Sequence, residues 1–146
     1  MNKEDIQLLT ADISARYPYF YSLRVQYNGK DYMPEGIGAG RISLFTSPIM
    51  SYTSFAPLIE EVKPYLRPMS DITDIERNEL SSKGIYIDKD GDIMVEAYEG
   101  RNISLQFIIS IYIEWLKKYH FDYNYLIEKG LALIAPKDMY SNQIEF

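Results

Sequence analysis

The sequence predicts an α+β fold in which antiparallel hairpins pack on a buried central helix, within a single domain of residues 1–146. Two hairpin-turn dipeptides, Asn28-Gly29 and Asp90-Gly91, each lie between stretches rich in apolar residues. Residues 103–119 form the most apolar stretch and are long enough to be a helix. Because the expected strands occur in hairpins and are not separated singly by helices, the sheet is expected to be antiparallel.

The first half of the chain is expected to alternate between one helix and several strands. A helix is predicted over residues 3–16, because apolar residues recur there at spacings of three and four. Alternating residues predict a strand over residues 19–27, which the Asn28-Gly29 turn joins to a return strand. The return strand is expected at residues 30–33, a further strand at 41–45, a flexible glycine-rich loop at 34–40 and irregular chain at 47–57.

The second half begins with a capped helix. Thr73 and Glu76 have the spacing of a capping box and Gly84 supplies a stop, which predicts a helix over residues 73–83. The remaining expected elements are a hairpin of residues 85–88 and 92–98, a short helix at 123–129 closed by Gly130, and a brief apolar segment at 131–135.

The pattern of residues 103–119 fits both a strand and a helix. Every odd position from Ile103 to Ile113 is apolar, as in a strand. The polar residues, however, are spaced by four, four and three, which is one stripe on a helix, and the length of the segment favours the helix. Trp115 is expected in the core, on the side opposite the polar stripe, which consists of Gln106, Ser110, Glu114 and Lys117.

The composition excludes several kinds of site. The 146 residues include no cysteine, which excludes disulfides and thiolate metal sites, and a single histidine, which excludes any site that needs two imidazoles. The net charge is −6, and the excess lies in residues 60–99, where eleven acids accompany five bases. This balance argues against a general nucleic-acid binder. No stretch approaches the ~20 apolar residues of a membrane span, and no signal peptide is visible, so a cytoplasmic location is expected.

Two segments resemble ligand-binding loops but lack a required residue. Asp88-Lys89-Asp90-Gly91-Asp92, with Glu99 further on, has carboxylates at calcium-loop spacing, but Ile93 occupies the sixth position, where the loop needs glycine. Gly36-Ile37-Gly38-Ala39-Gly40 lacks the third glycine of a dinucleotide loop and precedes a strand. A hairpin turn and a flexible loop are the favoured interpretations, and no metal or cofactor is expected.

His120 allows two interpretations. Beside Asp122 it would be an oriented general base, whereas at the end of the long helix it would cap and pack. Capping and packing are favoured. No Gly-x-Ser-x-Gly or His-Glu-x-x-His motif is present, so the sequence nominates no catalytic residue.

The tyrosines and the acidic middle of the chain are the candidate contact surfaces. Tyrosine is enriched in protein interfaces, but tyrosines also close the edges of a core, and this second interpretation is favoured for the fourteen here. An acidic stretch is either a solvated surface or a face that attracts a basic partner. The candidate interaction residues are Glu60, Glu61, Asp71, Asp74, Glu79, Tyr19, Tyr21, Tyr27 and Tyr123.

Two stretches together resemble a known group of proteins. One is Lys63-Pro64-Tyr65-Leu66-Arg67-Pro68-Met69-Ser70. The other runs from Glu114-Trp115-Leu116 through Tyr119-His120-Phe121-Asp122-Tyr123 to Leu126-Ile127-Glu128-Lys129-Gly130-Leu131-Ala132. They resemble short uncharacterised proteins carried by phages and prophages of gut bacteria. The resemblance implies a mobile-element origin and a small accessory protein, and it carries over no catalytic residues.

The leading hypothesis is therefore a small non-catalytic accessory protein of a phage or prophage that acts by contacting a host or phage protein. The alternative is a small-ligand or nucleotide-binding protein, which includes an enzyme that works through carboxylates and tyrosines. A deep pocket with converging Tyr, Arg and Asp side chains would favour the alternative, and a flat tyrosine face the first hypothesis. Neither a membrane nor a nucleic acid is an expected partner.

Overall fold

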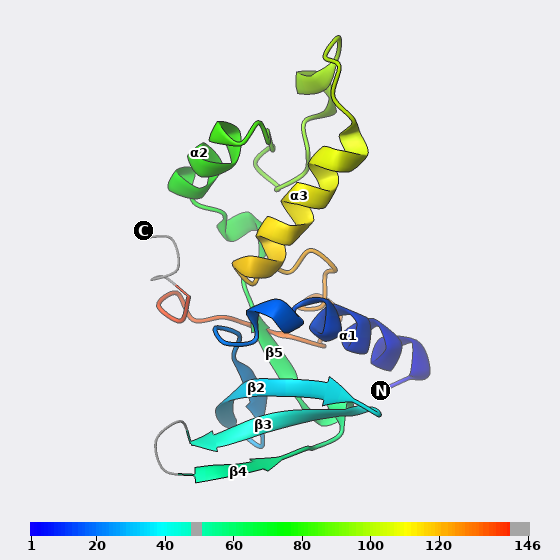
Figure 1. Ribbon diagram of the computed structural model, residues 1–146, viewed down its shortest axis with the longest axis vertical. Coiled ribbons are helices and arrows are strands. Elements are labelled where there is room, and N and C mark those ends of the chain that lie inside the picture. Colours follow the sequence, from blue (N-terminus) through cyan, green and yellow to red (C-terminus); the bar gives the residue numbers. More distant parts are fainter. Residues whose placement is uncertain (48–50, 141–146) are drawn as a thin grey trace.

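The computed structural model describes residues 1–47 and 51–140, and the α+β class is confirmed. Its six-stranded sheet has the order β4-β3-β2-β1-β5-β6 (Figure 1), and every neighbouring pair is antiparallel except β5 and β6. The strands are β1 (Val25–Tyr27), β2 (Lys30–Gly38), β3 (Arg41–Ser47), β4 (Ser51–Phe55), β5 (Lys63–Leu66) and β6 (Leu133–Ile134). The α-helices are α1 (Lys3–Ala15), α2 (Asp74–Ser82) and α3 (Leu105–Lys118), and the short 3₁₀ helices are η1 (Tyr17–Tyr19), η2 (Ile59–Glu61), η3 (Met69–Asp71) and η4 (Val95–Tyr98).

The first hairpin forms where Asn28-Gly29 predicts it. Tyr27 pairs with Lys30, and both turn residues have positive φ, 51° and 75°, as a two-residue hairpin turn requires. The strand before the turn is shorter than predicted and begins only at Val25, because residue 19 belongs to η1 and residues 20–22 form a turn. Pro18 favours η1, since its fixed φ suits the first turn of a helix.

The glycine-rich residues 34–40 are not the flexible loop that was expected. They continue β2 to Gly38 and then reverse into β3 through a tight turn at Ala39-Gly40, where both residues have positive φ. The strand predicted at residues 41–45 is confirmed as β3. The prediction of irregular chain at residues 47–57 is wrong for 51–55, which pair with β3 as β4, and residues 48–50 lie outside the described residues. Backbone pairing with a neighbouring strand accounts for the order of both segments.

Helix α1 packs on the sheet and forms the first of two large hydrophobic clusters. Leu9 and Ile13 of α1 are fully buried against side chains of β1, β3, β5 and η2. The members of this cluster come from residues 9–66 and from residues 126–132. None of the buried side chains of this cluster comes from the segment between them.

That intervening segment, residues 68–120, forms a second structural part, which we call the insert. The insert holds α2 and α3, and its buried side chains, with Phe121, make a second hydrophobic cluster. The capping box of α2 is confirmed: the Thr73 hydroxyl accepts the Glu76 N–H at 3.2 Å, and a Glu76 carboxylate oxygen accepts the Thr73 N–H at 2.9 Å. The helix stops before Gly84, which has a φ of 82°.

Two other predicted elements are reduced or absent. The hairpin of residues 85–98 is a turn with a single bridge, between Ile87 and Ile93, and residues 95–98 form η4. The helix predicted at 123–129 is wrong, because these residues form successive turns that the Asp122 carboxylate organises. The apolar segment at 131–135 contains β6, which pairs with β5.

Helix α3 is buried along one side and exposed at its N-terminal half. Trp115 is only 6% exposed and packs against the rings of Tyr119 and Phe121, so its predicted core position is confirmed. The predicted polar stripe lies on the opposite side, where it is mostly exposed. Helix α3 packs within the insert and contributes no buried side chain to the cluster beneath the sheet.

The chain enters and leaves the insert at one place. Arg67 and Phe121 form a parallel bridge, in which the Arg67 N–H donates to the His120 carbonyl at 2.8 Å and the Asp122 N–H donates to the Arg67 carbonyl at 2.9 Å. In Figure 1 the insert rises from this crossing, and the N-terminal end of α3 points away from the sheet. The crossing therefore determines how the two hydrophobic clusters sit relative to each other.

Candidate functional site

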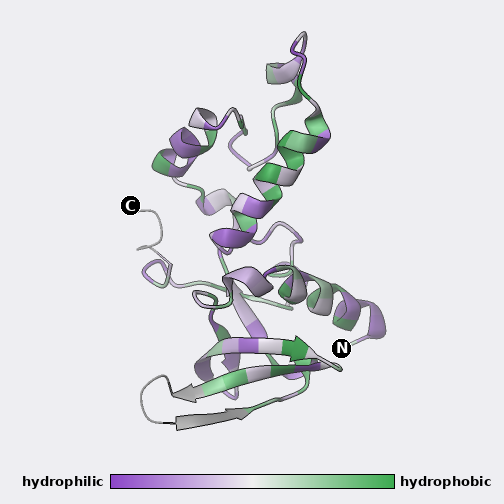
Figure 2. Cartoon of the chain, in the orientation of Figure 1, coloured by the Kyte–Doolittle hydropathy of each residue, from purple (hydrophilic) through white to green (hydrophobic). Residues whose placement is uncertain are grey.

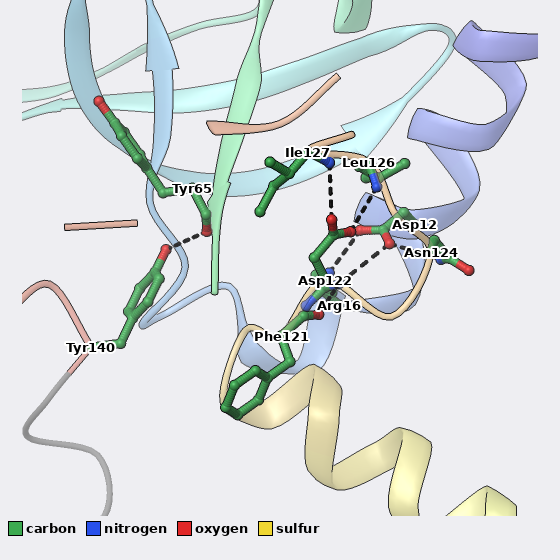
Figure 3. Close-up of polar contacts among 9 residues, drawn as sticks. All are labelled: Asp12, Arg16, Tyr65, Phe121, Asp122, Asn124, Leu126, Ile127 and Tyr140. Carbon is green, nitrogen blue, oxygen red and sulfur yellow. Dashed lines mark hydrogen bonds and ion pairs between the residues drawn. The ribbon is translucent and has the colours of Figure 1, made fainter. Parts of the chain in front are cut away.

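A buried ion pair lies beside the crossing (Figure 3). Arg16, which is fully buried, donates from Nε to Asp12 Oδ1 at 2.7 Å and from Nη2 to the Phe121 carbonyl oxygen at 2.7 Å. Asn124 donates to the second Asp12 oxygen at 2.8 Å. Asp12 and Arg16 belong to one helical turn at the end of α1, so this turn binds the chain that leaves the insert. We call Asp12, Arg16, the Phe121 carbonyl and Asn124 the buried junction.

Asp122 fixes the chain after the crossing. Its two carboxylate oxygens accept the backbone N–H groups of Leu126 and Ile127 at 2.8 and 2.9 Å (Figure 3). These bonds explain why no helix forms here, since a side chain supplies the turn with its acceptors. They also occupy Asp122, which makes no hydrogen bond to His120 among the described residues, so the geometry of an oriented general base is not present.

Tyr140 ties the end of the described chain to the sheet. Its hydroxyl donates to the Tyr65 carbonyl at 2.9 Å (Figure 3). The same hydroxyl accepts the Arg24 N–H at 3.0 Å. Burial raises the pKa of this hydroxyl far above its ordinary value, so it remains protonated and serves as a donor.

His120 ends α3 in the left-handed conformation, with a φ of 62°. Its N–H donates to the Lys117 carbonyl, and the next N–H, of Phe121, donates to the Leu116 carbonyl, which is the bond pattern that closes a helix on a left-handed residue. The imidazole is fully buried, with Nε2 2.8 Å from Ser22 Oγ and the ring 4.5 Å from that of Tyr140. The favoured interpretation, capping and packing, agrees with this geometry.

The environment of His120 is unsuited to proton transfer. Burial, together with the charges of Arg16, Arg24 and Arg67, lowers the pKa of His120 to about 3. The Nδ1 atom has no hydrogen-bond partner within residues 1–47 and 51–140. A Ser–His pair needs an acceptor on that nitrogen to orient the base, and the ring is closed to solvent, so Ser22 and His120 are a structural pair.

The second ion pair of the crossing lies on its insert side. Arg67 binds both oxygens of Glu76 at 2.7 Å, and its guanidinium lies 4.1 Å from the centre of the Phe121 ring. Because Glu76 also completes the cap of α2, the crossing and the first turn of α2 share one carboxylate. Removal of Glu76 would therefore affect folding before any surface property.

The five acidic candidates are divided between the two parts of the molecule. Glu60 and Glu61 lie on η2, which contacts α1, and Glu61 is bonded to the Leu58 N–H. The other three, Asp71, Asp74 and Glu79, lie on η3 and α2 of the insert, where the first two are exposed. The acidic middle of the sequence is thus a property of two surfaces.

Most of the tyrosine candidates close the edges of the clusters. Tyr27 packs its ring against Tyr32 and Phe55, and Tyr123 packs on the second cluster with the Arg16 guanidinium 5.1 Å from its ring centre. Tyr19 is half-buried and donates to Glu114 at 3.0 Å. Tyr21 alone among the four candidates is exposed.

The largest concentration of exposed apolar side chains is one that the sequence patterns did not reveal. Eleven large hydrophobic side chains are exposed within the described residues, and five of them lie in the short stretch 94–109. We call these five the apolar tip: Met94, Val95, Ile103, Phe107 and Ile109. They belong to η4 and the residue before it, to the start of α3 and to the chain between. This is the end of the insert far from the sheet, where Figure 2 shows the green of apolar residues on α3.

The sequence does not predict the apolar tip, because a narrow polar stripe is typical of a helix that is buried on most of its sides. Phe107, which is 61% exposed, and Ile109 flank that stripe on either side. The second cluster covers only the face of α3 that carries Ile108, Tyr112 and Trp115. The signal that could have found the tip is the width of the apolar surface of α3, which exceeds what one neighbouring segment can cover.

Tyr125 is a second unusual residue. It has a φ of 58° although it is a bulky residue, and its side chain is 56% exposed. The left-handed conformation is costly for a residue with a Cβ atom. Burial of the ring does not offset this cost, because more than half of the side chain is exposed. The Asp122 bonds to the next two residues impose this conformation.

Comparison with protein-family models, with curated proteins and with solved structures gives no match. Within the described ranges, no group of three or more His, Asp or Glu side chains is placed to hold a metal ion. No helix of residues 1–47 and 51–140 is long and apolar enough to cross a membrane.

The buried imidazole predicts a pH dependence of stability. Its pKa is about 3 in the fold and about 6.5 in an unfolded chain. Between these values the unfolded state therefore binds more protons than the folded state. The free energy of unfolding should have its full value above pH 6.5 and fall by about 1.4 kcal/mol per pH unit below it. Urea unfolding at pH 7.5, 6.0 and 5.0 measures this slope.

Asparagine also adopts the left-handed conformation, so His120→Asn is the matched control. The variant should lose the dependence between pH 6.5 and 5 that the wild-type protein shows. A wild-type stability that is flat over this range would show that His120 is not held neutral by the fold.

The left-handed conformation of Tyr125 predicts that glycine stabilises the fold more than alanine at this position, which is the reverse of their order inside a helix. Because both Tyr125→Gly and Tyr125→Ala remove the ring, their difference reports the backbone alone, and glycine should be more stable than alanine by about 1 kcal/mol. At Ser110, inside α3, the order should be the ordinary one, with alanine more stable. Thermal unfolding of the four variants tests the prediction, which fails if alanine is the more stable residue at both positions.

Proposed function

We propose that the protein is a small non-catalytic accessory protein, of phage or prophage origin, that acts by binding another protein through the apolar tip. The observation that carries the proposal is the exposure of Met94, Val95, Ile103, Phe107 and Ile109 at one end of the insert. Scattered exposed apolar residues are ordinary, whereas a concentration of them is typical of an interaction site.

The placement of the tip supports a binding role. Helix α3 is anchored at its C-terminal end by Trp115 and by the crossing, so it presents Phe107 on a rigid element. A rigid apolar anchor loses little conformational freedom on binding. The tip therefore has the composition and the rigidity of an interface centre.

The alternative, a ligand-binding protein or enzyme that uses carboxylates and tyrosines, finds less support. The carboxylates of the buried junction and of Asp122 are occupied by internal hydrogen bonds. The hydroxyls of Tyr65 and Tyr140 are likewise bonded within the fold. The alternative would be supported by polar groups that converge on one another and are free to bind a ligand. The carboxylates and hydroxyls named above are instead bonded within the fold.

Replacement of tip residues should abolish partner binding without unfolding the protein. The variant Phe107→Glu/Ile109→Glu places two charges where an apolar contact is expected, and it should lower the yield of a stoichiometric partner at least tenfold, an interface effect of about 1.4 kcal/mol or more. The measurement is affinity capture from gut bacteria before and after phage infection, with quantitative mass spectrometry.

The matched control is Ile134→Glu, an exposed isoleucine on β6 of the sheet. It should retain the partner, and all variants should keep the wild-type melting temperature within a few degrees. Capture of the same partners in equal amounts by all variants would contradict a role for the tip.

A further inference from the structure

Unpaired carboxylates accompany the apolar side chains of the tip. Asp90, Asp92, Glu96 and Glu99 are all exposed. Asp90 and Asp92 lie on the turn whose Gly91 carbonyl accepts the Tyr112 hydroxyl of α3, Glu96 lies on η4, and Glu99 directly follows η4. The ion pairs of residues 1–47 and 51–140 join Arg16 to Asp12, Arg67 to Glu76 and Lys117 to Glu114, so none of them neutralises these four acids.

The cations of the same region do not balance the acids. Only Lys89 and Arg101 are exposed between residues 89 and 101, and the Arg101 guanidinium lies over the Tyr86 ring at 5.8 Å. The half-buried Arg77 donates to the carbonyl oxygens of Asp88 and Lys89. The tip is therefore an apolar surface with a negative border.

One side of α3 at the tip has the shape of a packing helix. Phe107 and Ile111 are four residues apart and form a ridge, in which Phe107 is exposed and Ile111 is half-buried against the second cluster. A ridge at this spacing packs into the groove of a second helix. The polar stripe beside the ridge includes Ser110, which suits a partner with polar side chains among its apolar ones.

We infer that the apolar tip binds an amphipathic helix of a partner protein, whose apolar face is bordered by lysine and arginine. The inference rests on the proposed function and adds the chemistry of the partner. Charge complementarity at the border of an interface speeds association and excludes partners of the wrong sign.

The same charge disfavours the other occupants of an apolar surface. A second copy of this chain would bring the same four carboxylates against each other, and like charges at an interface are repulsive. An anionic lipid surface and a nucleic acid would be repelled for the same reason. A basic protein segment is the occupant that the tip attracts.

The test uses two synthetic helices that differ only in charge. One peptide has leucine on one face and lysine on the other, over about 14 residues or four turns, and its twin has glutamate in place of lysine. Binding to the full chain is measured by calorimetry at low and high salt. The lysine peptide should bind at a saturable one-to-one ratio, more weakly at high salt, and the glutamate twin should not bind.

Variants of the full chain locate the binding. Phe107→Glu should lower the affinity for the lysine peptide at least tenfold. Glu96→Gln/Glu99→Gln should lower this affinity several-fold and reduce its salt dependence. The matched control is Glu4→Gln/Glu128→Gln, which removes two exposed acids far from the tip and should change the affinity less than twofold. Vesicles of anionic lipid should not bind.

Each contrary result overturns a different statement. Equal binding of both peptides, each weakened by Phe107→Glu, would leave the tip as an interface and overturn the basic partner. If the two Glu→Gln pairs change the affinity for the lysine peptide equally, the peptide is held by net charge alone and the inference fails. The inference also fails if neither peptide binds, or if anionic vesicles bind instead. Failure of the proposed function appears separately, as a captured partner that ignores Phe107→Glu/Ile109→Glu.

Discussion

The buried guanidinium of Arg16 is the interaction on which the arrangement of the two hydrophobic clusters depends. A charge removed from water is costly unless its partners are well placed, and here Asp12 supplies the opposite charge from one turn earlier in the same helix. The remaining bond goes to the carbonyl of Phe121, more than a hundred residues away. Helix α1 is thereby hydrogen-bonded to the chain at the point where it leaves the insert.

This hydrogen bond helps to explain why the insert is fixed at the crossing and exposes apolar side chains at its far end. Arg16, Arg67 and Asp122 satisfy the backbone at the crossing, so the chain that enters and the chain that leaves are fixed side by side. Within residues 1–47 and 51–140, no comparable set of bonds covers the start of α3, where only Ile108 of the first turns is buried. Rigidity at one end and exposed apolar surface at the other are the combination that a binding element needs.

The parts that could be predicted from the sequence are those with a local physical cause. Asn28-Gly29 specifies its turn by the φ values it permits, Thr73 and Glu76 satisfy each other three residues apart, and the length of residues 103–119 distinguishes helix from strand. Strand β4 and the turns after Asp122 depend on partners far along the chain, and their residues carry no pattern that names those partners. For the same reason Asp12 and Arg16 resemble an ordinary surface pair in sequence, although both are buried.

The most direct test of the junction is hydrogen exchange in an Asp12→Asn/Arg16→Met variant, which removes both charges and leaves neither buried alone. The amides of Arg67 and Asp122, which bond across the crossing, should lose about 2 kcal/mol or more of exchange free energy. The amides of the β2–β3 ladder should lose less. Unchanged protection at Arg67 and Asp122, or an equal loss throughout the sheet and the crossing, would contradict the role given to Arg16.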